Sequence, residues 1–207
     1  GPGKPRPAAA RPLDAHRVRI EVTKLEGPGG GRTRFPGTVI NFVTGAPLPA
    51  TDVKIVGALD ALLDPVNAVG VVAGSSDAAG IVDLTSEGQV QEGIGVVAVV
   101  EGGALFLSLT GVATPMNGVY GPMSANHDLW GVPAATLSAW SALLMKEPAL
   151  APHLPLGEMG GSVGLVRDSS GAPVAGAVVE SVHADSQAKL RYLAQDGMSF
   201  NSVATAS

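Results

Sequence analysis

The sequence predicts a mainly β protein made of two related modules of short antiparallel strands. A segment that occurs twice gives the first indication: residues 37–53 read GTVINFVTGAPLPATDV, and residues 164–179 read GLVRDSSGAPVAGAVV. Each copy has the pattern of a strand, a Thr/Ser-Gly turn, a proline and a second strand. The composition agrees, because 28 Gly, 16 Pro and 45% apolar residues suit many short strands separated by turns.

The first module is predicted to be an antiparallel sandwich spanning residues 17–112. Near its start Val18, Ile20 and Val22 alternate with polar residues, which is the period-2 pattern of a strand with one buried face. With that strand, at residues 17–25, the chain has about seven, a normal number for a small sandwich. The other predicted strands are residues 38–43, 51–57, 69–73, 80–84, 94–101 and 105–110.

One connecting helix is predicted at residues 133–146. Pro133 suits a first helical position, and Pro148 prevents continuation much beyond Glu147. Three large apolar residues fall on one face of this helix and predict that it docks on a sandwich: Leu137, Trp140 and Leu144.

The remaining segments complete the predicted domain organisation. Residues 113–161 are expected to be irregular apart from the helix and to end in a Pro/Gly linker. Residues 162–207 are expected to form an incomplete second module. Residues 1–16 are rich in Pro, Ala and Arg, which predicts a flexible basic leader.

Charge is unevenly distributed along the chain. Residues 1–34 contain eight of the 13 Lys and Arg residues and three acidic ones, so they carry +5 while the rest carries −10. The basic segment lacks the interleaved aromatic residues of many nucleic-acid-binding segments. We expect contact with an anionic surface at most, and no nucleic acid.

Three motifs in order resemble the carboxypeptidase regulatory-like domain, a transthyretin-like (prealbumin-like) β-sandwich of Ig-like, Greek-key type. They are residues 37–53, residues 76–84 (SDAAGIVDL) and residues 92–100 (EGIGVVAVV). The second copy is similar from residue 164 to 179 and ends before any equivalent of the other two motifs. The resemblance implies one complete and one truncated copy. It also implies an accessory domain, usually non-catalytic, of the kind found beside peptidases, on surface adhesins and in outer-membrane receptors.

Candidate metal ligands are few. The absence of Cys excludes disulfides, thiolate metal sites and a cysteine nucleophile. Asp77 and Asp83 flank a predicted strand and are weak candidates for Ca²⁺. His127 and Asp128 supply two ligands, where a metal site takes roughly four. Each has a simpler interpretation as a turn or capping residue, so the expectation is no metal and no cofactor.

Enzymatic uses of this type of sandwich find little support in the sequence. Ring-cleaving dioxygenases that resemble it bind iron through two Tyr and two His. Here Tyr120 and Tyr192 lie 72 residues apart, and no His-x-His pair occurs. No Gly-x-Ser-x-Gly elbow of a hydrolase occurs either.

Interaction residues are predicted at two places. Trp130, in the segment before the helix, is the aromatic residue that best suits an exposed contact. Residues 198–204 are expected to form an open strand edge that contains Ser199, Phe200 and Val203 but no Lys or Pro to discourage pairing. We expect this edge to pair with another protein chain or with a second copy.

The sequence therefore predicts a non-catalytic extracytoplasmic β-sandwich that acts as a structural, adhesion or protein-interaction module. It would lie in the periplasm, on the outer-membrane surface or outside the cell, with any signal or anchor outside this sequence. The alternative is an accessory domain of a secreted peptidase, and a carbohydrate-binding or metal-dependent enzyme is a further one. No apolar stretch approaches the roughly 20 residues of a membrane span.

Overall fold

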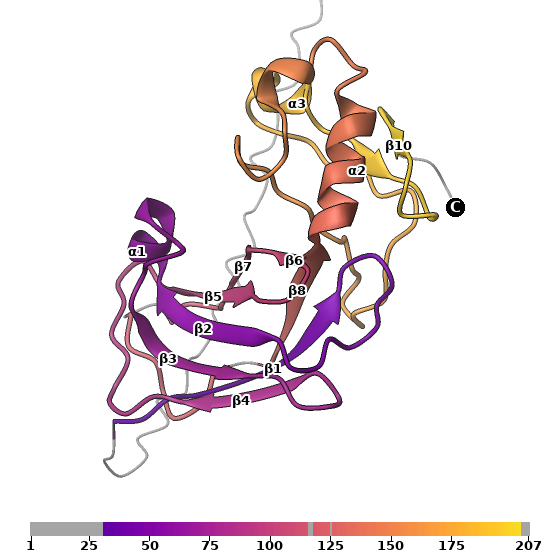
Figure 1. Cartoon of the computed structure of the whole chain (residues 1–207). Helices are drawn as coiled ribbons and strands as arrows, with labels where there is room; N and C mark the ends of the chain where they lie inside the picture. The colour runs from indigo at the N-terminus through magenta and orange to yellow at the C-terminus, as the bar shows by residue number, and fades with distance from the viewer. Residues whose placement is uncertain (1–30, 116–117, 125, 204–207) are drawn as a thin grey trace, which may run out of the picture.

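The computed structural model describes residues 31–115, 118–124 and 126–203, and a sandwich of two four-stranded sheets is its largest part (Figure 1). The strand orders are β4-β1-β8-β6 in one sheet and β3-β2-β5-β7 in the other. The mainly β sandwich predicted from the sequence is thereby confirmed. The strands are β1 (Arg34–Asn41), β2 (Asp52–Gly57), β3 (Gly70–Ser75), β4 (Ile81–Thr85), β5 (Val96–Glu101), β6 (Leu105–Phe106), β7 (Ser108–Gly111) and β8 (His127–Pro133).

The core lies between the two sheets and follows the alternation of the strands. In β1 the side chains of Phe35 and Val39 are buried, and in β4 those of Val82 and Leu84 are buried, while their neighbours in sequence are more exposed. The second sheet contributes Val53 and Ile55 from β2 and Val96, Ala98 and Val100 from β5. Aliphatic side chains therefore make up most of this core.

A short helix adds cover to the second sheet on its outer side. Helix α1 (Ala58–Leu63) follows β2 directly and buries Ala61. Ala61 packs with Val56 and Val99, whose side chains belong to a small apolar cluster separate from the main core. This second contact surface explains why β5 is almost continuously apolar and why Val56 follows the core residue Ile55 in β2.

The six strands predicted between residues 38 and 110 all have counterparts, the last of them dividing into β6 and β7. The predicted end of the sandwich at residue 112 is wrong. Strand β8 lies between β1 and β6 and pairs in parallel with β1, from Gly37↔His127 to Asn41↔Gly131. All other strand pairs in the described residues are antiparallel. The leader at residues 1–16 and the strand predicted at 17–25 lie outside the described residues.

Helix α2 (Ala134–Leu144) begins immediately after β8, with Pro133 as its N-cap, close to the predicted 133–146. Residues 154–203, here called the C-terminal unit, lie around this helix (Figure 1). The short elements after α2 are the 3-10 helix η1 (Ala151–His153), α3 (Ala184–Gln187), β9 (Tyr192–Leu193) and β10 (Phe200–Asn201). Within the described residues, none of the helices has the length and apolarity needed to cross a membrane.

The first copy of the repeated segment folds into a closed turn after β1. The Asn41 N–H donates to Ala46 O at 2.8 Å, and the Leu48 N–H donates to Val39 O at 2.9 Å. The side-chain oxygen of Asn41 accepts two further backbone N–H groups within the turn.

The second copy repeats these bonds with one residue fewer in the turn. The Asp168 N–H donates to Ala172 O at 2.9 Å, and the Val174 N–H donates to Val166 O at 2.9 Å. The Asp168 carboxylate takes the place of the Asn41 amide and accepts two N–H groups of the turn. The sequence repeat is therefore also a repeat of the backbone hydrogen-bond pattern.

The backbone dihedral angles agree as well. Gly45 and Gly171 close the two turns with φ of 69° and 87°. At the corner that follows, Ala50 has φ of 50° and Gly176, at the equivalent position, has φ of 68°. Ala50 is the one non-glycine residue with positive φ in the part of the chain that the structure describes. The two copies of the repeated segment therefore share a left-handed corner.

Candidate interaction site

A row of four aromatic rings joins the sandwich to the C-terminal unit. Phe42, just after β1, packs edge-on against Trp130 of β8, with ring centroids 5.5 Å apart, and against Trp140 of α2, at 6.2 Å. Trp140 in turn meets Phe200 of β10 at 6.0 Å in the same T-shaped manner. Such edge-to-face pairs add to the free energy that burial of the rings provides. We call this contact region the joint.

Trp140 is the centre of the joint. Its side chain is 1% exposed, and its indole Nε1–H donates to Gly197 O at 2.8 Å. Gly197 has φ of 67°, and a Cβ atom there would lie 2.5 Å from Cγ1 of Val43. A side chain at position 197 would therefore be strained and would also collide with the segment that follows β1.

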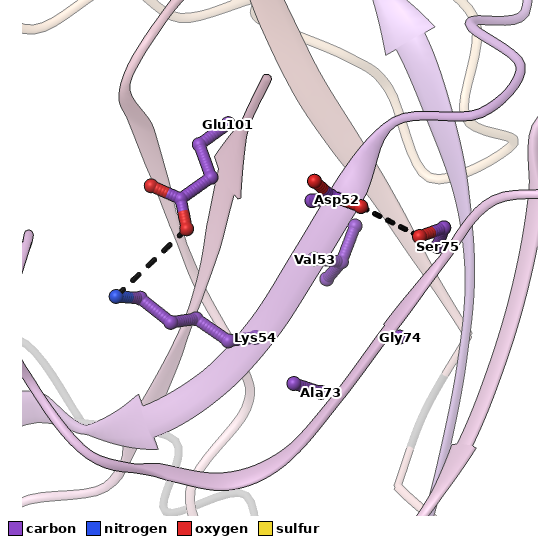
Figure 2. A pocket seen from close by; sticks show the side chains of 7 residues that line it. All are labelled: Asp52, Val53, Lys54, Ala73, Gly74, Ser75 and Glu101. Atoms are coloured by element: carbon purple, nitrogen blue, oxygen red, sulfur yellow. Dashed lines mark hydrogen bonds and ion pairs between the residues drawn. The ribbon is translucent and has the colours of Figure 1, made fainter.

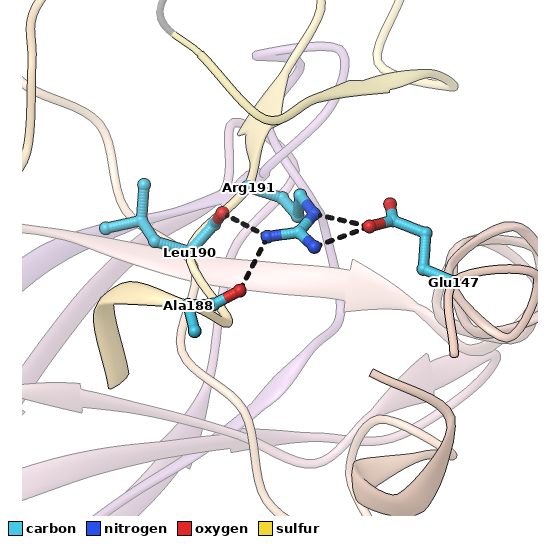
Figure 3. A network of polar contacts seen from close by, with 4 residues as sticks. All are labelled: Glu147, Ala188, Leu190 and Arg191. Carbon is cyan, nitrogen blue, oxygen red and sulfur yellow. Dashed lines mark hydrogen bonds and ion pairs between the residues drawn. The ribbon is translucent and has the colours of Figure 1, made fainter. Parts of the chain in front are cut away.

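An ion pair just after the end of α2 also joins the helix region to the C-terminal unit (Figure 3). Nε of Arg191 lies 2.9 Å from Oε2 of Glu147, and the Nη2 atom bonds the same oxygen. Nη1 donates to Ala188 O at 3.0 Å and to Leu190 O at 2.7 Å. The hydrogen bond from Arg191 holds the pKa of Glu147 below its ordinary value. The guanidinium thus ties the segment before β9 to the residues that follow α2.

The second copy of the turn also contacts the sandwich. Nη1 of Arg167 lies 2.9 Å from Oδ2 of Asp128, and the guanidinium carbon lies 5.5 Å from the ring centre of Trp130. Arg167 therefore combines an ion pair with a cation–π contact on strand β8. The ring of Trp130 therefore has two intramolecular partners, Phe42 and Arg167.

A shallow polar depression lies on the outer face of the second sheet (Figure 2). Oδ1 of Asp52 accepts a hydrogen bond from the Ser75 hydroxyl at 2.6 Å, and the Lys54 ammonium lies 3.9 Å from Glu101. Lys54 also donates to Val66 O at 2.7 Å. These polar groups bind one another, so this arrangement does not single out a nucleophile or an acid–base pair.

The calcium candidates occupy separate structural roles. Oδ1 of Asp77 accepts the N–H groups of Ala79 and Ile81, both at 2.8 Å, as expected of a turn residue. Asp83 lies on β4 and forms a two-bond ion pair with Arg34, at 2.6 and 2.7 Å. That contact lowers the pKa of Asp83. The hydrogen bonds of Asp77 and the ion pair of Asp83 hold the two carboxylates in separate contacts.

The side chains of His127 and Asp128 do not converge on a common site. Neighbouring residues of a strand project to opposite faces of the sheet. Asp128 pairs with Arg167, whereas Nε2 of His127 is buried and has no hydrogen-bond partner in the described part of the chain. Burial lowers the pKa of His127. Among residues 31–115, 118–124 and 126–203, no three His, Asp or Glu side chains gather in a way that could hold a metal ion.

The two tyrosines also remain apart. Tyr120 is 3% exposed in the sandwich core, where its hydroxyl accepts the Val96 N–H at 3.2 Å and reaches Thr114 Oγ1 at 3.4 Å. The hydroxyl of Tyr192 binds the backbone of Val179 in the C-terminal unit. The Tyr120 hydroxyl therefore lies in the sandwich and the Tyr192 hydroxyl in the C-terminal unit.

The predicted interaction residues near the end of the chain have mixed environments. Phe200 packs on Trp140 in the joint, and the Ser199 hydroxyl bonds both carboxylate oxygens of Asp196. Val203 is 65% exposed. Of these three residues, Val203 alone offers a large apolar surface to a partner.

Comparison with protein-family models and with curated proteins finds no match. Among solved structures, the chain is similar to 3-chlorocatechol 1,2-dioxygenase from Rhodococcus opacus 1CP, with 11% identity, a TM-score of 0.33, and coverage of 51% of this chain and 62% of the other. It is also similar to the shaft pilin SpaA of Lactobacillus rhamnosus GG, with 12% identity, a TM-score of 0.30, and coverage of 50% and 47%.

A third similar structure is the pilus 2b backbone protein of group B streptococcus, with 14% identity, a TM-score of 0.30, and coverage of 56% and 48%. The matches thus span less than two thirds of each of these structures. They are to β-sandwich proteins and do not single out the carboxypeptidase regulatory-like family that the sequence resembles.

Sequence reasoning identified Trp140 but missed most of its partners. Phe42 lies inside the repeated segment, at a place where the second copy has Ser, and this difference was the available signal. The pairing of Glu147 with Arg191 spans 44 residues and has no local pattern. Only the tertiary structure brings these two charges together.

Proposed function

We propose that the chain is a non-catalytic structural and protein-interaction module of an extracytoplasmic assembly, in which the joint holds two consecutive modules in a fixed orientation. The observation that carries this proposal is the burial of Trp140. This residue lies on α2 and is packed between the segment after β1 and the C-terminal unit. A helix that only linked the two modules would not be expected to bury a tryptophan against both of them.

The contacts at the joint support a role in fixing the orientation of the two modules. They combine aromatic packing, a buried hydrogen bond and two arginine–carboxylate pairs, so the orientation does not depend on any single bond. The aromatic contacts involve four parts of the chain: the segment after β1, β8, α2 and β10. Relative motion of the two modules would have to break these contacts together.

The proposed partner contact is the edge of β10. Phe200 and Asn201 pair with Leu193 and Tyr192 of β9, and no other strand pairs with β10 in the described residues. The unpaired edge and the exposed Val203 support recruitment of another strand. We expect concentration-dependent self-association of the whole chain, measured by sedimentation velocity. A strict monomer at high concentration would overturn this part of the proposal.

The extracytoplasmic location is supported by the resemblance of residues 37–53, 76–84 and 92–100 to domains of surface and secreted proteins. Separation of cells of the source into cytoplasmic, periplasmic and outer-membrane fractions and the surrounding medium tests this location. Recovery of the chain in the cytoplasmic fraction alone would overturn it.

Small-angle X-ray scattering on the full chain tests the fixed orientation. The wild-type curve should fit one compact arrangement across a range of salt concentrations. Trp140→Ala should increase the radius of gyration and broaden the distance distribution, while Leu62→Ala, at a site 78% exposed on α1, should not. A wild-type curve that requires a broad ensemble of orientations would overturn the proposal.

A further inference from the structure

The second copy of the turn leaves exposed the valines that the first copy buries. Val39 and Val53 flank the first turn and are 0% and 1% exposed. The repeat aligns them with Val166 and Val179, which are 42% and 40% exposed. The same local fold therefore presents an apolar surface that is covered in one module and uncovered in the other.

In the first module, residues 76–84 bind the turn and supply part of the apolar cover, alongside side chains of β5 and β8. The Val39 N–H donates to Gly80 O at 2.7 Å. At the corner the Ala50 N–H donates to Ser76 O at 3.1 Å, and the Thr51 N–H donates to Oγ of Ser76 at 3.0 Å. Residues 76–80 thus bind the turn through one serine and one glycine.

The covering segment continues directly into strand β4. β4 pairs antiparallel with β1, with Ile81 opposite Thr38. Its side chains Val82 and Leu84 are 1% and 8% exposed and belong to the same core cluster as Val39 and Val53. The cover therefore supplies both hydrogen-bond acceptors at the corner and apolar side chains at every second position.

The equivalent donors of the second copy lack these acceptors. The N–H groups of Val166, Gly176 and Ala177 correspond to those of Val39, Ala50 and Thr51. None of the three donates a hydrogen bond within the described part of the chain. Backbone donors and exposed valines thus coincide on one surface, which is the combination that an added β-strand satisfies.

The contact of Arg167 with the sandwich leaves this surface accessible. Arg167 reaches Asp128 and Trp130, whereas its neighbour Val166 takes part in neither contact and is 42% exposed. Arg167 therefore holds the second turn against strand β8. Val166 remains uncovered.

We propose that residues 163–179 form an acceptor surface for an extended segment of a partner protein with the sequence pattern of residues 76–85. That pattern is a serine at the corner, an Asp-x-x-Gly turn, and apolar residues alternating with polar ones. This inference deepens the proposed interaction function and rests on it, but it concerns a surface separate from the edge of β10. The first module of the same chain defines the chemistry of the occupant.

A synthetic peptide of residues 74–86 (GSSDAAGIVDLTS) is the probe. We expect saturable binding of the fluorescein-labelled peptide to the full chain by fluorescence anisotropy, with amide NMR shifts centred on residues 163–179. Val166→Asp in the protein should weaken binding roughly tenfold or more, because it places a charge against an apolar strand. Ala177→Pro, which removes one N–H donor, should also weaken it.

Two controls make the result specific. Leu62→Asp changes another exposed apolar site, on α1, which is 78% exposed against 42% for Val166, and should leave binding unchanged. A peptide with Asp in place of Val82 and Leu84 should not bind. Because Val166 is exposed, Val166→Asp should retain the wild-type melting temperature, which shows that weaker binding does not result from unfolding.

Three outcomes would overturn the inference: no saturable binding, equal loss of binding with Leu62→Asp, or NMR shifts centred on β1, which would indicate exchange with β4. Self-association that Val166→Asp abolishes, without peptide binding, would identify a second copy as the occupant and also overturn it. Scattering and sedimentation of the wild-type chain do not depend on the peptide. They separate failure of this inference from failure of the proposed function.

Discussion

The indole N–H of Trp140 donates to the carbonyl oxygen of Gly197, 57 positions later in the chain, at 2.8 Å. The tryptophan is buried and the glycine has no room for a side chain, so each residue fixes the position of the other. This contact ties the helix that follows the sandwich to the last described strands. The stability of the C-terminal unit should therefore depend on a residue outside it.

Replacing Trp140 with Ala should lower the free energy of unfolding by about 3–5 kcal/mol, because a large buried ring and its hydrogen bond are lost. Urea denaturation followed by circular dichroism measures this loss. The matched control, Leu62→Ala on the exposed side of α1, should change it by no more than about 0.5 kcal/mol. A loss under about 1 kcal/mol for Trp140→Ala would mean that the helix does not dock.

Gly80→Ala should destabilise the sandwich more than Gly45→Ala. Both glycines have positive φ, 77° and 69°, so each substitution carries a left-handed penalty of about 1–2 kcal/mol. At position 80 the added Cβ would also lie 2.8 Å from Val39 O and 2.9 Å from Cβ of Pro47, whereas at position 45 nothing lies within 4 Å. Thermal unfolding of the two variants tests this order, and equal melting temperatures would contradict it.

The Glu147–Arg191 pair should stabilise the protein at neutral pH and lose its effect in acid. The pKa of Glu147 is lowered in the folded chain, so its contribution is present above the ordinary carboxyl pKa and disappears as the pH falls through the folded value. Glu147→Gln should therefore lower the melting temperature near pH 7, and the difference should shrink on acidification. Glu158→Gln, at an exposed position, is the control. A pH-independent difference would contradict this assignment.

His127 should make the protein less stable as the pH falls below about 6.5, the ordinary pKa of histidine. Burial lowers the pKa in the folded chain, so the unfolded chain takes up the proton first and is favoured by acid. His127→Leu should be neutral or stabilising at pH 7, because Nε2 has no partner among the described residues, and should flatten the stability profile between pH 7 and 5. His153→Leu, at an exposed position, should leave the profile unchanged.

Most of the sandwich could be predicted from local sequence patterns. Short segments separated by turn residues located β1 to β7 within a few residues, and the interpretation of Asp77 as a turn residue agrees with its hydrogen bonds. Strand β8 could not be found this way. Its sequence contains Gly131 and ends in Pro133, and its partner β1 lies about 90 positions earlier, so its pairing depends on tertiary structure.

The joint was predictable only in part. The helical spacing of Leu137, Trp140 and Leu144 predicted a docked helix, and the structure buries Trp140 and Leu144. The residues that receive them were not predictable, because contacts such as Trp140 with Phe200 join segments that share no periodic pattern. Propensity and periodicity describe single elements, whereas such contacts depend on how the elements are arranged.

The parallel pairing of β1 with β8 has a mechanical consequence. The chain enters the described sandwich at the start of β1 and leaves it at the end of β8, and in a parallel pair these two points lie at opposite ends. A stretching force applied through the two ends would pull the strands past each other along their length. The bonds from Gly37↔His127 to Asn41↔Gly131 would then be loaded in shear together instead of separating one at a time. Such a sandwich would resist tension along the chain better than one whose end strands could be peeled away.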